Sequence, residues 1–82
     1  MTEITLFGRP GCHLCDEVRD EILALREQGY RFRLVEVDIE SDEELLREHL
    51  VRIPVVEVDG EVVSELLLDR SALMARLDTL VR

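Results

Sequence analysis

The chain has 82 residues, a length that suits one small domain over residues 1–82 and leaves too little surface to bury a second core. Its 46% hydrophobic and 35% charged residues are typical of a globular protein and exclude a disordered or collagen-like chain. Nineteen acidic residues against ten basic ones give a formal net charge of −9. A chain this acidic repels phosphates, so we expect neither nucleic acid nor a membrane surface among its partners.

The N-terminal residues, Met1 to Phe7, lack the basic segment and long apolar run of a signal peptide. No stretch approaches the roughly 18 consecutive apolar residues that a transmembrane helix requires. The expected location is therefore the cytoplasm, and the expected state is a monomer.

The first half of the chain predicts a strand, a helix and a second strand. Residues Glu3 to Phe7 alternate apolar with polar side chains before a turn rich in glycine and proline, which indicates a first strand. Apolar residues at helical spacing predict a helix from His13 to Gln28, and Gly29 suits its left-handed cap. Residues Arg31 to Ile39 predict a second strand that either has both faces covered or carries a bulge. Such a unit has parallel strands, with the helix packed on the sheet.

A short second helix is predicted by a capping pattern. Ser41 is followed three residues later by Glu44, an arrangement in which the two side chains cap the free backbone N–H groups of a helix start. Leucines behind this pattern provide an apolar stripe, and the helix is expected to end near Val51.

A hairpin and a final helix complete the chain. Pro54 blocks helix continuation, and Asp59-Gly60 predicts a type I′ turn between strands at Val55 to Val58 and Glu61 to Ser64. Asp69 is placed to cap a last helix. Three leucines recur along that helix at helical spacing: Leu73, Leu77 and Leu80. The predicted order is β-α-β-α-β-β-α, a layered α/β domain.

Cys12 and Cys15 stand where the glycine-rich turn meets the first helix. They are too close in sequence to act as a disulfide framework of the secreted kind, because the loop they close is very short. Free N–H groups and the helix dipole favour a thiolate at a helix start, and C-x-x-C thiols there have lowered pKa values. We therefore predict that Cys12 is the attacking thiolate and that Cys15, one turn later, is the resolving thiol.

The same spacing also occurs in half of a metal site. A closed zinc site needs four ligands, and the remaining candidates, His13 and His49, do not form the usual second pair. His49 is expected among surface charges of the second helix, so metal binding within one chain is the less favoured interpretation. For His13 we hold the hypothesis that a partly protonated imidazole beside Cys12 favours the thiolate; the alternative is an exposed histidine without a role.

The residues Phe7-Gly8-Arg9-Pro10-Gly11-Cys12-His13-Leu14-Cys15, followed by Ile53-Pro54 and the Asp59-Gly60 hairpin, are similar to the glutaredoxin-like branch of the thioredoxin superfamily. This resemblance implies a single α/β domain with a mixed four-stranded sheet and three helices on both faces. It implies a cis peptide bond between Ile53 and Pro54 across from the cysteines, where the Ile53 backbone pairs with an extended substrate. Arg9 and Arg52 flank the implied site as candidate substrate contacts.

The chain departs from the glutaredoxin pattern in three places. Glutaredoxins usually carry Pro-Tyr between the cysteines, a threonine where Arg52 stands, and a Gly-Gly pair after the hairpin that holds glutathione. Here the segment from Ser64 to Asp69 contains no glycine. Glutathione is therefore a doubtful partner, and a flavoprotein reductase is the alternative candidate for the reductant. No tightly bound cofactor is expected.

The sequence thus predicts a thiol–disulfide oxidoreductase that reduces disulfides of proteins or small molecules. Two other classes stay open. One is a carrier in which Cys12 from each of two chains and two external thiols bind an iron–sulfur cluster. The other is a non-catalytic interaction module that uses the acidic surface.

Overall fold

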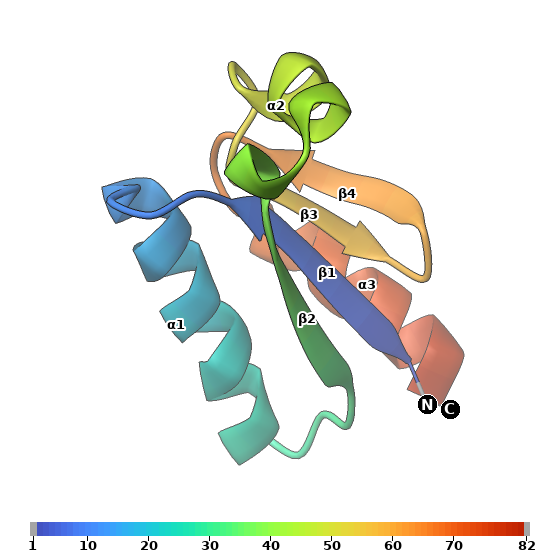
Figure 1. Ribbon diagram of the computed structural model, residues 1–82. Coiled ribbons are helices and arrows are strands. Elements are labelled where there is room, and N and C mark those ends of the chain that lie inside the picture. The colour runs from blue at the N-terminus through green and yellow to red at the C-terminus, as the bar shows by residue number, and fades with distance from the viewer. Residues whose placement is uncertain (1, 82) are drawn as a thin grey trace.

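The computed structural model describes residues 2–81 of the protein, with side chains over residues 2–78. The described chain contains one sheet of four strands and three α-helices in the predicted order β-α-β-α-β-β-α (Figure 1). The elements are β1 (Glu3–Gly8), α1 (His13–Glu27), β2 (Arg33–Asp38), the 3₁₀ turn η1 (Ile39–Ser41), α2 (Glu43–His49), β3 (Val55–Val58), β4 (Glu61–Glu65) and α3 (Arg70–Val81).

The sheet is mixed, as predicted, with the strand order β2-β1-β3-β4. β1 pairs with β2 in parallel and with β3 antiparallel. The β3–β4 turn has φ angles of 48° at Asp59 and 90° at Gly60, which confirms the type I′ hairpin. β2 pairs residue by residue with β1, so it carries no bulge along this pairing. A register shift occurs instead in the hairpin, between Val56 and Glu57 of β3.

One face of the sheet packs against both α1 and α3. Ile4 and Leu6 alternate along β1, and Val56 and Val58 along β3, so all four side chains point to the same face. They form one buried cluster with the apolar stripes of the two helices, in which Ile22, Leu73 and Leu77 are fully buried. This cluster fixes the position of α1, and with it the cysteine pair, relative to the end of β1.

The opposite face is covered at one end by α2. The Phe7 side chain points away from the main core and stacks on His49, with 4.5 Å between ring centroids. His49 is therefore buried, with 6% of its surface exposed, and the expectation that it lies among surface charges is wrong. The physical reason is that α2 spans less than two turns and turns its last residue onto the sheet.

The structure shifts several predicted boundaries. β2 begins at Arg33 and ends at Asp38, because Ile39 starts the 3₁₀ turn with a fully buried side chain. The cap of α2 is Asp42, whose carboxylate accepts from the N–H of Glu44 at 2.8 Å. Ser41 was the wrong residue, because its hydroxyl donates to the Asp38 carbonyl at 2.6 Å instead. α2 also ends at His49, before Val51.

The start of α3 follows the prediction. The Asp69 carboxylate accepts from the N–H of Ala72 at 3.0 Å, which is the expected N-cap contact. Leu73 and Leu77 are buried, and the side chain of Leu80 lies outside the described part of the chain. Within residues 2–81, no helix is long and apolar enough to cross a bilayer.

Candidate redox site

The turn after β1 places Cys12 at the start of α1. The Cys12 N–H donates to the Arg9 carbonyl at 3.2 Å, which closes a four-residue turn. Pro10 occupies its second position and Gly11, with φ of 78°, its third, the arrangement of a type II turn. Only a residue that tolerates positive φ fits the Gly11 position, so the glycine in the motif has a geometric cause.

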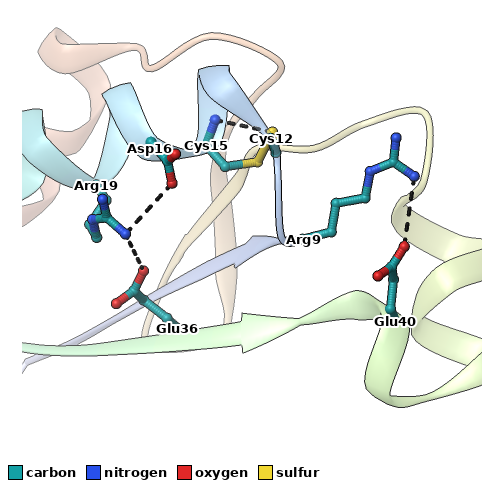
Figure 2. Close-up of a disulfide and its surroundings, with 7 residues drawn as sticks. All are labelled: Arg9, Cys12, Cys15, Asp16, Arg19, Glu36 and Glu40. Carbon is teal, nitrogen blue, oxygen red and sulfur yellow. Dashed lines mark hydrogen bonds and ion pairs between the residues drawn. A yellow bond between two sulfur atoms is a disulfide. The ribbon is translucent and has the colours of Figure 1, made fainter.

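Cys12 is the N-cap residue of α1, and a disulfide joins it to Cys15, with 5.2 Å between their Cα atoms. The Cys12 sulfur also accepts a hydrogen bond from the backbone N–H of Cys15 at 3.1 Å (Figure 2). The backbone carbonyl of Cys12 accepts a hydrogen bond from the N–H of Asp16 at 3.1 Å. The sulfur of Cys12 therefore occupies the place that a capping oxygen takes in other helices.

The two sulfurs differ in access. Cys12 is partly exposed, whereas Cys15 keeps 5% of its surface exposed and packs against the end of β1. A Cβ atom placed on Gly8 would lie 2.9 Å from the Cys15 sulfur, so this strand end must be glycine for Cys15 to fit. This role of Gly8 was not predicted from the sequence. The sequence feature that could have indicated this role is the position of the glycine, at the end of the first strand and four residues before Cys12.

The segment before β3 comes to the same end of the sheet. Phe7 in β1 pairs with Val55 in β3, so Gly8 at the end of β1 lies beside the residue before Val55. Pro54 is buried there, and the Ile53–Pro54 peptide bond is cis. The N–H of Ile53 donates to the carbonyl of His49 at 3.0 Å, which ties this segment to α2.

The charged residues expected at the site are exposed. Arg9 extends away from the disulfide and approaches Glu40 of η1, with 4.0 Å between nitrogen and oxygen (Figure 2). The imidazole of His13 lies 3.7 Å from the carboxylate of Glu17. Arg52 is exposed, and its carbonyl accepts from the N–H of Leu66 at 3.0 Å. The three side chains are thus exposed, and those of Arg9 and His13 lie near carboxylates of this chain.

A pocket of about 320 Å³ reaches Cys15 from the side of β2. Arg19 lies at this pocket and approaches Asp16 at 3.6 Å and Glu36 at 3.7 Å, which links α1 to β2 (Figure 2). The sequence analysis did not single out Arg19. Asp16 and Arg19 are three residues apart on one helix face, and this spacing could have indicated an ion pair between them.

Metal-ligating side chains do not gather in the described part of the chain. No group of three or more histidine, cysteine, aspartate or glutamate side chains there is arranged to hold a metal ion.

The family model described as "Glutaredoxin-like domain (DUF836)" matches residues 3–78. The chain belongs to this glutaredoxin-like family. The match includes every residue of the cysteine turn, the Ile53–Pro54 segment and the hairpin, which confirms the resemblance inferred from those motifs. A search of curated proteins finds no match.

Solved structures of similar proteins share the fold of this chain. Protein Ne2328 from Nitrosomonas europaea is 27% identical, with a TM-score of 0.81 over 92% of this chain and 89% of that one. Target protein XcR50 from X. campestris is 28% identical, with a TM-score of 0.74 over 93% and 96% of the two chains. The oxidised thioredoxin of Plasmodium falciparum, 19% identical with a TM-score of 0.62 over 99% and 82% of the two chains, shares the fold.

Proposed function

We propose that this glutaredoxin-like protein carries out thiol–disulfide exchange and reduces disulfide substrates. In the reduced protein, the Cys12 thiolate attacks one sulfur of the substrate disulfide. A Cys12–substrate bond forms, the substrate S–S bond breaks, and the departing thiolate takes up a proton. The Cys15 thiolate then attacks the Cys12 sulfur, the Cys12–Cys15 bond forms, and the second substrate thiol leaves. Two electrons have passed to the substrate, and the protein is left oxidised.

The observation that supports this proposal best is the position of Cys12 as the cap of α1. Its sulfur already accepts the backbone N–H of Cys15, and it lies at the end of the helix that carries positive partial charge. A hydrogen bond and a positive potential both stabilise a thiolate more than a neutral thiol. The arrangement therefore favours the attacking form of this sulfur.

The burial of Cys15 supports its role as the resolving thiol. A thiol with 5% of its surface exposed cannot meet a large substrate disulfide, yet it lies within bonding distance of Cys12. The different access of the two sulfurs thus supports attack by Cys12 and resolution by Cys15. The pocket beside Asp16 and Arg19 gives water a route to Cys15 for the proton that it must lose.

We assign the neighbouring residues to substrate binding. The Ile53 carbonyl accepts a hydrogen bond from an extended substrate chain in this proposal, while the Ile53 N–H stays bonded to the carbonyl of His49. Arg9, His13 and Arg52 are exposed on the surrounding segments, and the two arginines supply positive charge there. Glutathione or a flavoprotein reductase returns the protein to its reduced form, and a reducing compartment such as the cytoplasm suits this cycle.

The proposal is tested by trapping. The reduced Cys15→Ser variant can attack a disulfide but cannot resolve the product, so it should accumulate partners joined covalently to Cys12. Mass spectrometry of the non-reduced adducts would identify both partner and linkage site, with Cys12→Ser as the control that forms none. Equal adduct levels in the two variants would contradict the proposed roles.

A further inference from the structure

Most of the large exposed apolar side chains lie on three segments of the chain, and three of them line one groove. In the part of the chain whose side chains are described, six such residues are at least 43% exposed, and Val62 on β4 is the one that lies elsewhere. The other five are on the first turn of α1, the turn after α2 and the segment after β4: Leu14, Leu50, Val51, Leu66 and Leu67. Apolar side chains that cluster on the surface of a monomer mark a binding surface.

The backbone holds these segments against one another. The N–H of Leu66 donates to the carbonyls of both Arg52 and Pro54, each at 3.0 Å. Leu66 has φ of 68°, a left-handed conformation that is costly for a leucine. The two hydrogen bonds maintain this conformation, and Leu66 and Leu67 remain 52% and 69% exposed. Strained backbone of this kind is often found where a protein holds a ligand.

A groove of about 300 Å³ runs between α1 and the segment after β4. Leu14, Val18, Leu66 and Leu67 supply apolar walls, and Glu17 and Glu21 supply two carboxylates, whereas no arginine or lysine lines it. Leu14 stands between Cys12 and Cys15 in the sequence, so one wall of the groove belongs to the turn of α1 that carries the cysteine pair. A chain attached to Cys12 through its own cysteine would therefore place its next residues in this groove.

The charges of the groove indicate which chain fits. The Glu17 carboxylate lies 3.7 Å from the His13 imidazole, and the Glu21 carboxylate lies 3.9 Å from the Arg70 guanidinium. All four side chains are about half exposed or more. Exposed ion pairs of this kind contribute little, so both carboxylates stay open to a cation from a partner. The net charge of −9 also attracts basic chains and repels small anionic thiols.

We propose that this groove binds a polypeptide segment of a protein substrate, with an apolar side chain beside the reacting cysteine and a basic residue beyond it. The apolar side chain packs between Leu14 and Leu67, and the basic residue meets Glu17. This inference rests on the proposed exchange function and narrows its substrate class from disulfides in general to protein disulfides. A small anionic disulfide fills neither part of the groove.

The test uses the reduced full-length protein and two extended peptides, each with one cysteine linked by a disulfide to a coloured aromatic thiol. One peptide carries leucine beside the cysteine and lysine beyond it; the other carries serine and glutamate. Attack of Cys12 on the peptide sulfur releases the coloured thiolate, and Cys15 then displaces the peptide thiol, so one turnover needs no added reductant. Stopped-flow absorbance gives the second-order rate constant for each peptide.

The leucine–lysine peptide should react about tenfold faster or more, since partial burial of one leucine is worth about 1.4 kcal/mol. Leu67→Ser should reduce this ratio several-fold, and Glu17→Gln should reduce it and weaken its dependence on salt. Val62→Ser is the matched control, an exposed apolar residue outside the groove, and should leave the ratio unchanged.

The outcomes separate the two proposals. A wild-type ratio near one, or a ratio that Leu67→Ser leaves unchanged, would overturn the docking inference while leaving the exchange function intact. If the wild-type protein releases no coloured thiolate from either peptide or from the symmetrical aromatic disulfide, the exchange function itself fails.

Discussion

Two single residues decide how the cysteine pair is held. Gly11 permits the turn that brings Cys12 to the helix start, and Gly8 leaves room for the Cys15 sulfur at the end of β1. Neither residue takes part in chemistry. Their contribution is to let α1 begin close to the sheet, so that one sulfur faces outward and the other inward.

Gly8→Ala should destabilise the oxidised protein by about 1–3 kcal/mol, the usual cost of forcing extra atoms into a packed site. The new Cβ atom would meet the Cys15 sulfur at 2.9 Å and its Cβ at 3.0 Å. Urea unfolding measures this cost. In a Cys15→Ala background the sulfur is gone, so the same substitution should cost less. An equal cost in both backgrounds would show that the sulfur is not the obstacle.

Glu57 makes stability depend on pH. Burial raises the pKa of its carboxyl group, an effect that His49 opposes and Glu48 reinforces. The folded protein therefore holds this proton more tightly than the unfolded chain, so stability falls as the pH rises through the titration of Glu57. Glu57→Gln should remove that fall and gain up to about 0.5 kcal/mol at neutral pH, given the partial exposure of the site. Urea unfolding at pH 4 to pH 8 would contradict this if both proteins showed the same slope.

Among the helices, strands and turns, local sequence patterns predict those features that depend only on residues close together in the chain. The Asp59-Gly60 hairpin, the Asp69 cap and the helical spacing of α1 are of this kind, and all are present. The family resemblance also supplied the cis bond at Pro54, which the residues alone do not disclose.

What the sequence did not reveal depends on contacts between distant segments. The burial of His49 needs the ring of Phe7, which is 42 residues earlier in the chain. The role of Gly8 likewise needs α1 to pack on β1. Ser41 and Asp42 are both good capping residues, and the 3₁₀ turn decides between them because it already uses the Ser41 hydroxyl.

The cap of α3 can be tested on its own. Asp69→Ala removes the acceptor for the Ala72 N–H and should cost about 1 kcal/mol of unfolding free energy. Asp69→Asn keeps an oxygen acceptor while removing the charge, so it should retain most of the stability. Thermal unfolding of both variants separates the two contributions. If both variants lost the same stability, the charge and not the cap contact would be responsible.

For the whole molecule, the fold brings three distant segments to one end of the sheet. The cysteine turn, the Ile53–Pro54 segment and the segment after β4 meet there, and three of the six large exposed apolar side chains lie on or beside them: Leu14, Leu66 and Leu67. The chain as a whole carries a formal net charge of −9. A protein substrate would therefore be directed to the disulfide by the apolar groove and by its own basic residues.

The central claim is that the Cys12 thiol is ionised and accessible in the reduced protein. The most direct measurement is the rate of alkylation of Cys12 by iodoacetamide as a function of pH in the Cys15→Ser variant, with a short cysteine peptide as reference. We expect a midpoint well below the value of about 8.5 for free cysteine and faster alkylation at neutral pH. A midpoint and rate equal to those of the peptide would contradict it.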